Sequence, residues 1–166
     1  MWPTWFWKDH LGQKPFKQKD NLYISRDEIR FSLLGDDTSE YFSKEKEVYR
    51  EFIWRIYNGL KSGYNVIADA THLNEKSRFK LISRIPQDVL KEQNIIITAI
   101  YIKVPLNVCI ERNNTRRKQK TYVPIDQLRR MYFSATEPTF KECNGKIDEI
   151  IIVNENGKII KGLKRN

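Results

Sequence analysis

The sequence predicts an α/β domain with a mainly parallel sheet. Short β-branched runs such as Asn65–Asp69 and Ile95–Val104 alternate with segments whose apolar residues recur at helical spacing. Strands that alternate with helices in this way favour a parallel sheet covered by helices. The chain has 166 residues, of which 40% are hydrophobic and 31% charged, and this suits one folded domain with its own core.

The first half of the chain predicts two strands around one long helix. Leu22–Ile24 is a short apolar run before a charged turn and is typical of a strand end. A helix is predicted over Lys44–Lys61, and Gly63 ends it in the usual place. The residues Asn65–Asp69 form a short β-branched run that is typical of a buried parallel strand. The apolar residues that set the helical period are Val48, Phe52, Ile56 and Leu60.

A shorter helix follows the second of these strands. Asn74 can cap a helix from Glu75 to about Ile85, and Pro86 interrupts it. We expect the inward side chains of this helix to be Phe79, Leu81 and Ile82.

The second half begins with the strongest predicted strand, Ile95–Val104, which is almost continuously apolar. Pro105 opens a helix that carries Cys109, and Pro124 opens another over Ile125–Phe133. The last strand is predicted at Ile150–Val153, followed by a hairpin turn at Glu155–Gly157 and a return through Lys158–Ile160. The apolar face of the Pro124 helix is predicted to contain Ile125, Leu128 and Met131.

Composition limits the classes of partner. Thirty Lys and Arg against twenty-one Asp and Glu give a formal net charge of +9, which favours anionic partners such as nucleotides and nucleic acid. The two cysteines and two histidines have no metal-ligand spacing, so no metal site is predicted from them. No run approaches 18 apolar residues, and the opening residues lack the pattern of a signal peptide. We therefore expect a cytoplasmic protein without a membrane partner; the oligomeric state stays open.

Residues 1–20 do not fit this pattern. A parallel α/β domain of this kind should begin with an apolar strand and a glycine-rich turn, whereas this segment shows neither helical nor strand periodicity. Three of the four tryptophans of the chain occur here, as Trp2, Trp5 and Trp7. The segment can be a disordered aromatic arm, an anchor at a membrane interface, or the product of a frameshift.

The genetic code favours the frameshift. Tryptophan has a single codon, TGG, and a forward shift by one base turns each such codon into GGN, which encodes glycine. The codons of Lys8, Asp9 and His10 then allow Lys or Arg followed by Thr or Ile. The shifted frame is compatible with G-x-x-x-x-G-K-[ST], the loop whose backbone N–H groups surround phosphates. We therefore predict an aberrant segment over residues 1–20 and a folded α/β domain over 21–166 that lacks its phosphate-binding loop (P-loop).

A charged turn after the first strand contains the first candidate site residues. Within Ser25–Arg30, a carboxylate (Asp27 or Glu28) could accept a proton from an attacking hydroxyl, and a neighbouring arginine could hold the phosphate of an acceptor. Taken alone, the segment is more typical of a charged turn that starts a helix than of a catalytic site.

The residues after the strand at Asn65–Asp69 form a second candidate. Ligands bind at the carboxyl ends of strands in α/β sheets, so Asp69 could hold Mg²⁺ or its water and Thr71 could contact substrate. The alternative is that Asp69 and Asn74 only cap turns. His72 is expected to be a surface side chain.

The third candidate is the basic stretch Arg112–Lys120. Arg112 and Arg116 are four residues apart, so on a helix they can project together and bind a polyphosphate. Its position between two helices favours a mobile lid around residues 112–123 over a solvated charge run.

In this order, the three segments resemble the phage-type polynucleotide 5′-kinases and the wider P-loop kinase group, over roughly residues 21–140. Val123–Asp126 and Met131–Tyr132 look like the segment that follows the lid in that family. The resemblance implies a three-layer P-loop kinase fold with its first strand and P-loop missing or degraded. It also implies ATP and Mg²⁺, and the 5′ end of a nucleic acid as acceptor.

The resemblance also assigns roles to residues. Asp27 would be the general base, Arg30 with Arg26 would bind the acceptor, and Arg112 with Arg116 would stabilise the transition state. The segment with Asp69, Thr71 and Asn74 looks like the substrate motif that closes the third strand, and Asp69 would assist Mg²⁺. Two alternatives remain: a kinase of small molecules or nucleosides on the same fold, and an inactive kinase remnant that at most binds nucleic acid.

Overall fold

The computed structural model describes residues 21–34, 43–92, 94–117 and 122–165. The predictions for residues 1–20 and for Lys118 and Lys120 lie outside these ranges. The described residues form two compact units. One contains residues up to Thr71 together with Arg84–Ile95, and the other contains His72–Ser83 and the chain from Ile96 onward.

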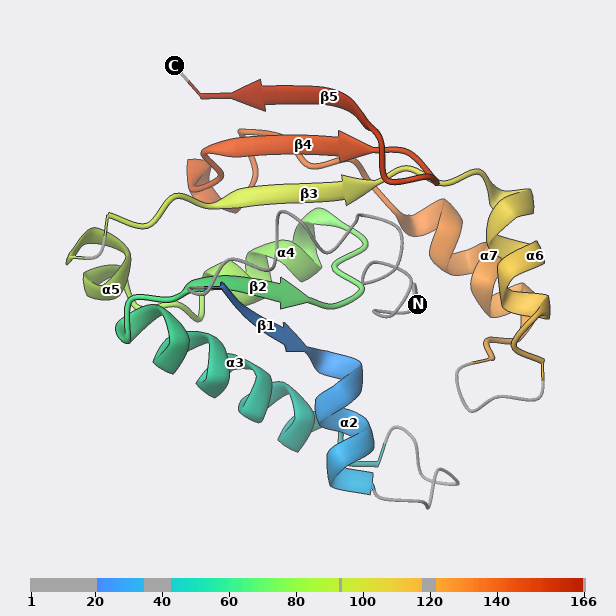
Figure 1. Ribbon diagram of the computed structural model, residues 1–166, viewed down its shortest axis with the longest axis horizontal. Coiled ribbons are helices and arrows are strands. Elements are labelled where there is room, and N and C mark those ends of the chain that lie inside the picture. Colours follow the sequence, from blue (N-terminus) through green and yellow to red (C-terminus); the bar gives the residue numbers. More distant parts are fainter. Residues whose placement is uncertain (1–20, 35–42, 93, 118–121, 166) are drawn as a thin grey trace. The chain divides into compact units, whose positions relative to one another are not determined.

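The first unit is a two-stranded parallel sheet with helix α3 packed on it (Figure 1). Strand β1 spans Asn21–Ser25 and strand β2 spans Asn65–Asp69, in a register that pairs Ser25 with Asp69. The strand ends that carry candidate residues therefore lie at the same edge of this sheet. Helix α3 spans Glu45–Lys61, as predicted apart from one residue at its start.

Close packing fixes α3 against this sheet. The buried residues of the helix are Val48, Phe52, Ile56 and Gly59. A Cβ atom on Gly59 would lie 2.7 Å from Leu22 Cδ2 and 2.9 Å from Val66 Cγ2, so the helix approaches both strands at this point. Gly63 follows the helix with a φ of +80°, a conformation that favours glycine.

Two further helices belong to this unit. Helix α2 spans Arg26–Leu34 and begins directly after β1, which confirms the helix expected after the charged turn. Helix α5 spans Gln87–Glu92 and was not predicted. Its six residues are too few to show a helical period, and Pro86 immediately before it is a favourable start rather than only an interruption.

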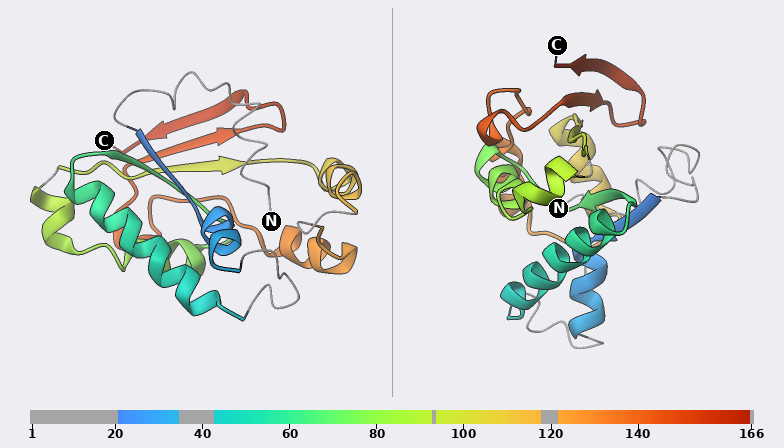
Figure 2. Two further views of the ribbon diagram at one scale, coloured as in Figure 1. Left: turned by 60° about the horizontal axis from the view of Figure 1, so that its bottom comes forward. Right: turned by 90° about the vertical axis from the view of Figure 1, so that its left-hand side faces the viewer.

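The second unit contains a three-stranded sheet in the order β3-β4-β5 (Figure 1). Strand β3 (Thr98–Ile102) pairs in parallel with β4 (Glu149–Val153), and β5 (Ile159–Lys164) pairs antiparallel with β4. The turn between β4 and β5 contains Gly157 with a φ of +76°, so the predicted hairpin is confirmed (Figure 2).

Two hydrophobic clusters form the core of this unit. One joins Ile150 and Ile152 of β4 to Ile82 of helix α4 (Glu75–Ile82) and to Ile147 near the short 3-10 helix η1 (Cys143–Gly145). The other lies between α6 (Leu106–Asn114) and α7 (Ile125–Ser134), which lie side by side (Figure 2). Its buried residues are Val104, Cys109, Val123 and Leu128.

Three details of the prediction were wrong. Helix α4 ends at Ile82 rather than near Ile85, and Phe79 is 42% exposed instead of facing inward. Arg78 takes the inward position, because Glu142 and nearby carbonyl groups pair with all sides of its guanidinium. Strand β3 is also shorter than the apolar run Ile95–Val104.

The α/β class with a mainly parallel sheet is confirmed. In the described part of the chain, β2 and β3 belong to separate sheets and form no ladder with each other. This is consistent with a P-loop kinase fold whose first strand, which would be central in the sheet, is missing or degraded. None of the helices in the described ranges combines the length and the apolar character needed to span a bilayer.

Candidate functional site

The first candidate site lies at the start of α2. Ser25, the last residue of β1, is buried, and its Oγ accepts a hydrogen bond from the backbone N–H of Glu28 at 3.2 Å. This contact is typical of a helix N-cap, so the helix begins where the strand ends. Asp27 lies in the first turn, where the helix macrodipole favours a carboxylate.

Four charged side chains form a continuous chain of ion pairs here, which we call the α2–α3 charge cluster. Arg30 Nη1 donates to Asp27 Oδ1, and Arg30 Nη2 donates to Glu45 Oε2 at 2.9 Å. Arg26 Nη2 donates to the other oxygen, Oε1, of Glu45. Glu45 therefore bridges the two arginines, and the four formal charges of the cluster balance.

Burial makes this cluster more than a surface ion pair. Arg30 is 4% exposed and the Asp27 side chain 17%, so both charges are largely removed from water. Burial, together with the neighbouring Arg30 guanidinium, lowers the pKa of Arg26. The Arg26 guanidinium also lies over the ring of Tyr49, 5.2 Å from its centroid. Burial raises the pKa of Tyr49.

The second group lies at the end of β2. Asp69 Oδ2 accepts a hydrogen bond from the hydroxyl of Tyr23, which projects from β1. The strand register puts Asp69 next to Ser25, one residue before Arg26. Thr71 lies two residues beyond β2 and is half-buried. The structure thus brings Arg26, Asp27, Arg30 and Asp69 to one edge of one sheet.

The described residues offer few ligands for a metal ion. They contain no group of three or more His, Cys, Asp or Glu placed to hold a metal. Mg²⁺ commonly keeps several waters and needs only one or two carboxylates from the protein. A single carboxylate at a strand end, such as Asp69, fits a contact to Mg²⁺ through water.

The predicted lid arginines lie in the other unit. Arg112 is on α6, and its Nη2 donates to the backbone carbonyl of Glu155 at 3.0 Å. Arg116 follows the helix, is 5% exposed, and donates from Nε to the carbonyl of Arg112 at 3.2 Å. Burial, with the Arg112 charge nearby, lowers the pKa of Arg116.

Asn113 ties the two ends of the predicted lid together. Its Nδ2 donates to the carbonyl of Val123 at 2.8 Å, and its Oδ1 accepts from the N–H of Val123 at 3.0 Å. Asn113 is 1% exposed, so both bonds are shielded from water. This pair fixes the chain on each side of the segment between α6 and α7.

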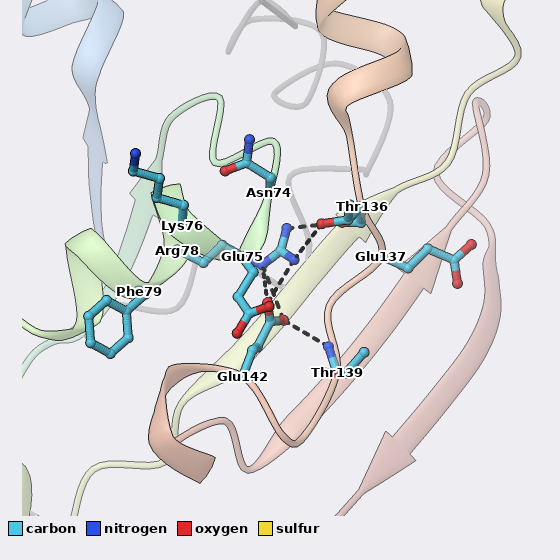
Figure 3. A pocket seen from close by; sticks show the side chains of 9 residues that line it. All are labelled: Asn74, Glu75, Lys76, Arg78, Phe79, Thr136, Glu137, Thr139 and Glu142. Atoms are coloured by element: carbon cyan, nitrogen blue, oxygen red, sulfur yellow. Dashed lines mark hydrogen bonds and ion pairs between the residues drawn. The ribbon is translucent and has the colours of Figure 1, made fainter.

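Asn74 is used as a helix cap. Its side chain accepts from the N–H of Ser77 at 3.1 Å, and the Ser77 hydroxyl accepts from the N–H of Asn74 at 3.1 Å. This reciprocal capping box starts α4. The side chain lines the edge of a pocket of about 580 Å³ (Figure 3).

The floor of that pocket is a buried ion pair. Arg78 donates to both carboxylate oxygens of Glu142 and to the carbonyl and hydroxyl of Thr136 (Figure 3). It also donates to the carbonyl of His72 at 3.2 Å. Glu142 also accepts from the N–H of Thr139 at 2.7 Å. Arg78 and Glu142 are 8% and 3% exposed. Because these groups satisfy one another, we assign them a structural role.

Sequence reasoning missed Glu45, Tyr49, Arg78 and Glu142. Glu45 and Tyr49 are four residues apart on α3, on the side of the helix that faces α2. A polar position within an otherwise apolar helical period was the signal that could have pointed to Glu45. Arg78 and Glu142 are too far apart in sequence for any local pattern to connect them.

Comparisons with known proteins identify the family to which the chain belongs. A family model described as an AAA domain matches residues 4–138, which include every candidate site residue. The chain is 29% identical over 168 residues to the L-seryl-tRNA(Sec) kinase of Methanococcus maripaludis. This alignment covers 88% of the chain and 63% of the length of that relative. The family match, which spans most of the chain, shows that the protein belongs to the AAA domain family, a P-loop kinase-like family.

Proposed function

We propose that this domain is an ATP-dependent phosphotransferase whose acceptor is a hydroxyl group carried by a nucleic acid. The observation that carries the proposal is the α2–α3 charge cluster, in which Asp27 and two arginines lie at the carboxyl end of a parallel strand. The kinase relative and the family support the reaction class.

The proposed reaction is an in-line transfer. The acceptor hydroxyl attacks the γ-phosphorus of ATP, the bond from that phosphorus to the bridging oxygen breaks, and ADP leaves. Asp27 accepts the proton of the attacking hydroxyl, and its ion pair with Arg30 holds the carboxylate in one orientation. Arg26 and Arg30 bind a phosphate of the acceptor in place of part of their contact with Glu45.

The remaining roles involve the nucleotide. Asp69 would hold Mg²⁺ or one of its waters, and the ion would supply positive charge to neutralise the phosphates. Arg112 and Arg116 stabilise the charge that develops during transfer, and this requires their side chains to leave the carbonyl groups that they now contact. The P-loop is supplied by the shifted frame of residues 2–10, outside the described residues, so the proposal concerns the frame-restored chain.

The acceptor has two candidates. The resemblance to polynucleotide kinases favours the 5′-hydroxyl of DNA or RNA. The L-seryl-tRNA(Sec) kinase relative favours the serine hydroxyl of an aminoacylated tRNA, which is the acceptor that its name specifies. Both are hydroxyl groups on a nucleic acid, and the formal charge of +9 suits such an acceptor.

A panel of acceptors tests the proposal. We define the frame-restored chain as the protein in which the codons of residues 2–10 and those upstream are translated in the shifted frame. It is incubated with Mg²⁺ and γ-labelled ATP, together with a 5′-hydroxyl oligonucleotide, L-seryl-tRNA, a nucleoside mixture or small sugars. We expect label on the oligonucleotide; label on seryl-tRNA alone would assign the second acceptor. Label only on nucleosides or sugars would refute the nucleic-acid acceptor.

The chain as written is the matched control. It lacks the P-loop sequence, so we expect no transfer from it to any acceptor. Salt-sensitive binding of oligonucleotides by the frame-restored chain without any transfer would instead support an inactive kinase remnant.

A further inference from the structure

The outer face of α3 combines aromatic and basic side chains. One side of this helix is buried against β1 and β2 through Val48, Phe52, Ile56 and Gly59. At 100° per residue, the positions opposite this buried side are Arg50, Trp54, Tyr57 and Lys61. We call these four residues the Trp54 stripe.

Trp54 is the centre of the stripe. It is 59% exposed, which is high for the largest apolar side chain, so much of the indole surface faces solvent. The side chain of Asn58, one turn further on, donates to the backbone carbonyl of Trp54 at 3.0 Å and so supports the helix at this point. The indole is therefore presented on a rigid element rather than on a loop.

Cationic groups lie on both sides of the indole. Arg50 and Lys61 are exposed, and Lys61 Nζ lies 5.8 Å from the centroid of the Tyr57 ring. At a rise of about 1.5 Å per residue, the stripe from Arg50 to Lys61 is roughly 16 Å long, which is the span of a few nucleotides. The adjacent Glu51 is paired with Arg55 at 2.7 Å, so its charge is partly neutralised.

The geometry points to the Trp54 stripe as a docking surface for single-stranded nucleic acid, in which a base stacks on Trp54 and the backbone phosphates contact Arg50 and Lys61. Aromatic platforms flanked by cations bind single strands in this way without reading their sequence. The inference rests on the proposed nucleic-acid acceptor, because the stripe would hold a part of the acceptor away from the reacting hydroxyl. A duplex, whose bases are stacked internally, offers no face to Trp54.

Binding measurements on the chain as written test this surface. The probe is a fluorescently labelled oligothymidylate of fifteen nucleotides, followed by anisotropy at several salt concentrations. Base stacking contributes about 1–3 kcal/mol, so Trp54→Ala should weaken binding by about 5- to 150-fold. Trp54→Phe should retain most of the affinity, because it keeps an aromatic face. Arg50→Gln and Lys61→Gln should each reduce the salt slope by up to about 0.7.

Phe133→Ala is the matched control. Phe133 is 75% exposed on α7, so this variant removes an exposed aromatic ring from the other unit. We expect it to bind as the parent does. Circular dichroism of Trp54→Ala should match the parent, because the indole contributes little to the core.

Three results would overturn the inference: unchanged binding by Trp54→Ala, an equal loss with Phe133→Ala, or an equal loss with single-stranded and duplex probes. Self-association that Trp54→Ala abolishes without any change in oligonucleotide binding would also overturn it, since the stripe would then join two copies. The assay needs no phosphate transfer. A confirmed stripe with no transfer in the acceptor panel would therefore refute the proposed activity alone.

Discussion

Replacing Arg78 should destabilise the chain more than any exposed charge does. Arg78→Met keeps an unbranched side chain of similar reach but removes the guanidinium. Glu142 would then remain at 3% exposure with its charge unpaired, although the N–H of Thr139 would still donate to it at 2.7 Å. The carbonyls of His72 and Thr136 would also lose their donors.

The magnitude follows from the burial of the pair. Removing one partner of a buried ion pair costs about 3–5 kcal/mol, since the other charge stays in a medium of low polarity. With a urea dependence of about 2 kcal/mol per molar, the midpoint of unfolding should fall by roughly 2 M. The double variant Arg78→Met/Glu142→Leu removes both charges, so it should recover most of this loss.

Urea unfolding followed by circular dichroism measures these effects. Arg129→Met is the control, because Arg129 is 55% exposed and lies 3.8 Å from an exposed Asp126 carboxylate. It should change the free energy of unfolding by no more than about 0.5 kcal/mol. If Arg78→Met lost less than about 1 kcal/mol, or if the double variant were less stable than the single one, the buried Glu142 charge would not depend on Arg78 for its stability.

Three more predictions concern Asp27 as the proposed base, Asn113 next to the proposed lid, and the two thiols. Asp27→Ala in the frame-restored chain should abolish transfer but leave ATP binding intact, and unchanged turnover would end its assignment as base. Asn113→Ala loses two buried hydrogen bonds to the backbone and should cost about 2–3 kcal/mol in urea unfolding, whereas the exposed Asn114→Ala should cost little. Burial raises the pKa of both Cys109 and Cys143 to about 11, so neither thiol should react rapidly with a disulfide reagent at pH 8 until the chain unfolds. The thiols of the unfolded chain ionise near pH 9, so the free energy of unfolding should fall as the pH rises from about 9 to 11. A urea midpoint that stays constant over this range would contradict the raised pKa values of the two cysteines.

The strands and long helices could be predicted because their signals are local. The run Asn65–Asp69 and the period of α3 each show in a window of a few residues, and both elements form as expected. Phe79 shows the limit of this reasoning. Its hydrophobicity predicted an inward side chain, but the pairing of Arg78 with Glu142, sixty-four positions further on, decided which face of α4 is buried.

The contacts of the candidate site that lie within one helix could be predicted, but those between helices could not. Asp27 and Arg30 are three residues apart on one helix, so their ion pair follows from helical spacing. Glu45 joins the same cluster only because α3 packs against α2, and no local pattern expresses that contact. The bond between Asn113 and Val123 likewise depends on how α6 and α7 pack.

We propose that this kinase-like domain has its phosphate-binding loop encoded in the shifted reading frame of residues 2–10. The most direct test is calorimetric titration of the chain as written and of the frame-restored chain with ATP and Mg²⁺. We predict saturable one-site binding by the frame-restored chain and none by the chain as written. Equal ATP binding by both chains, or no ATP binding by the folded frame-restored chain, would contradict the assignment of the phosphate-binding loop to the shifted frame.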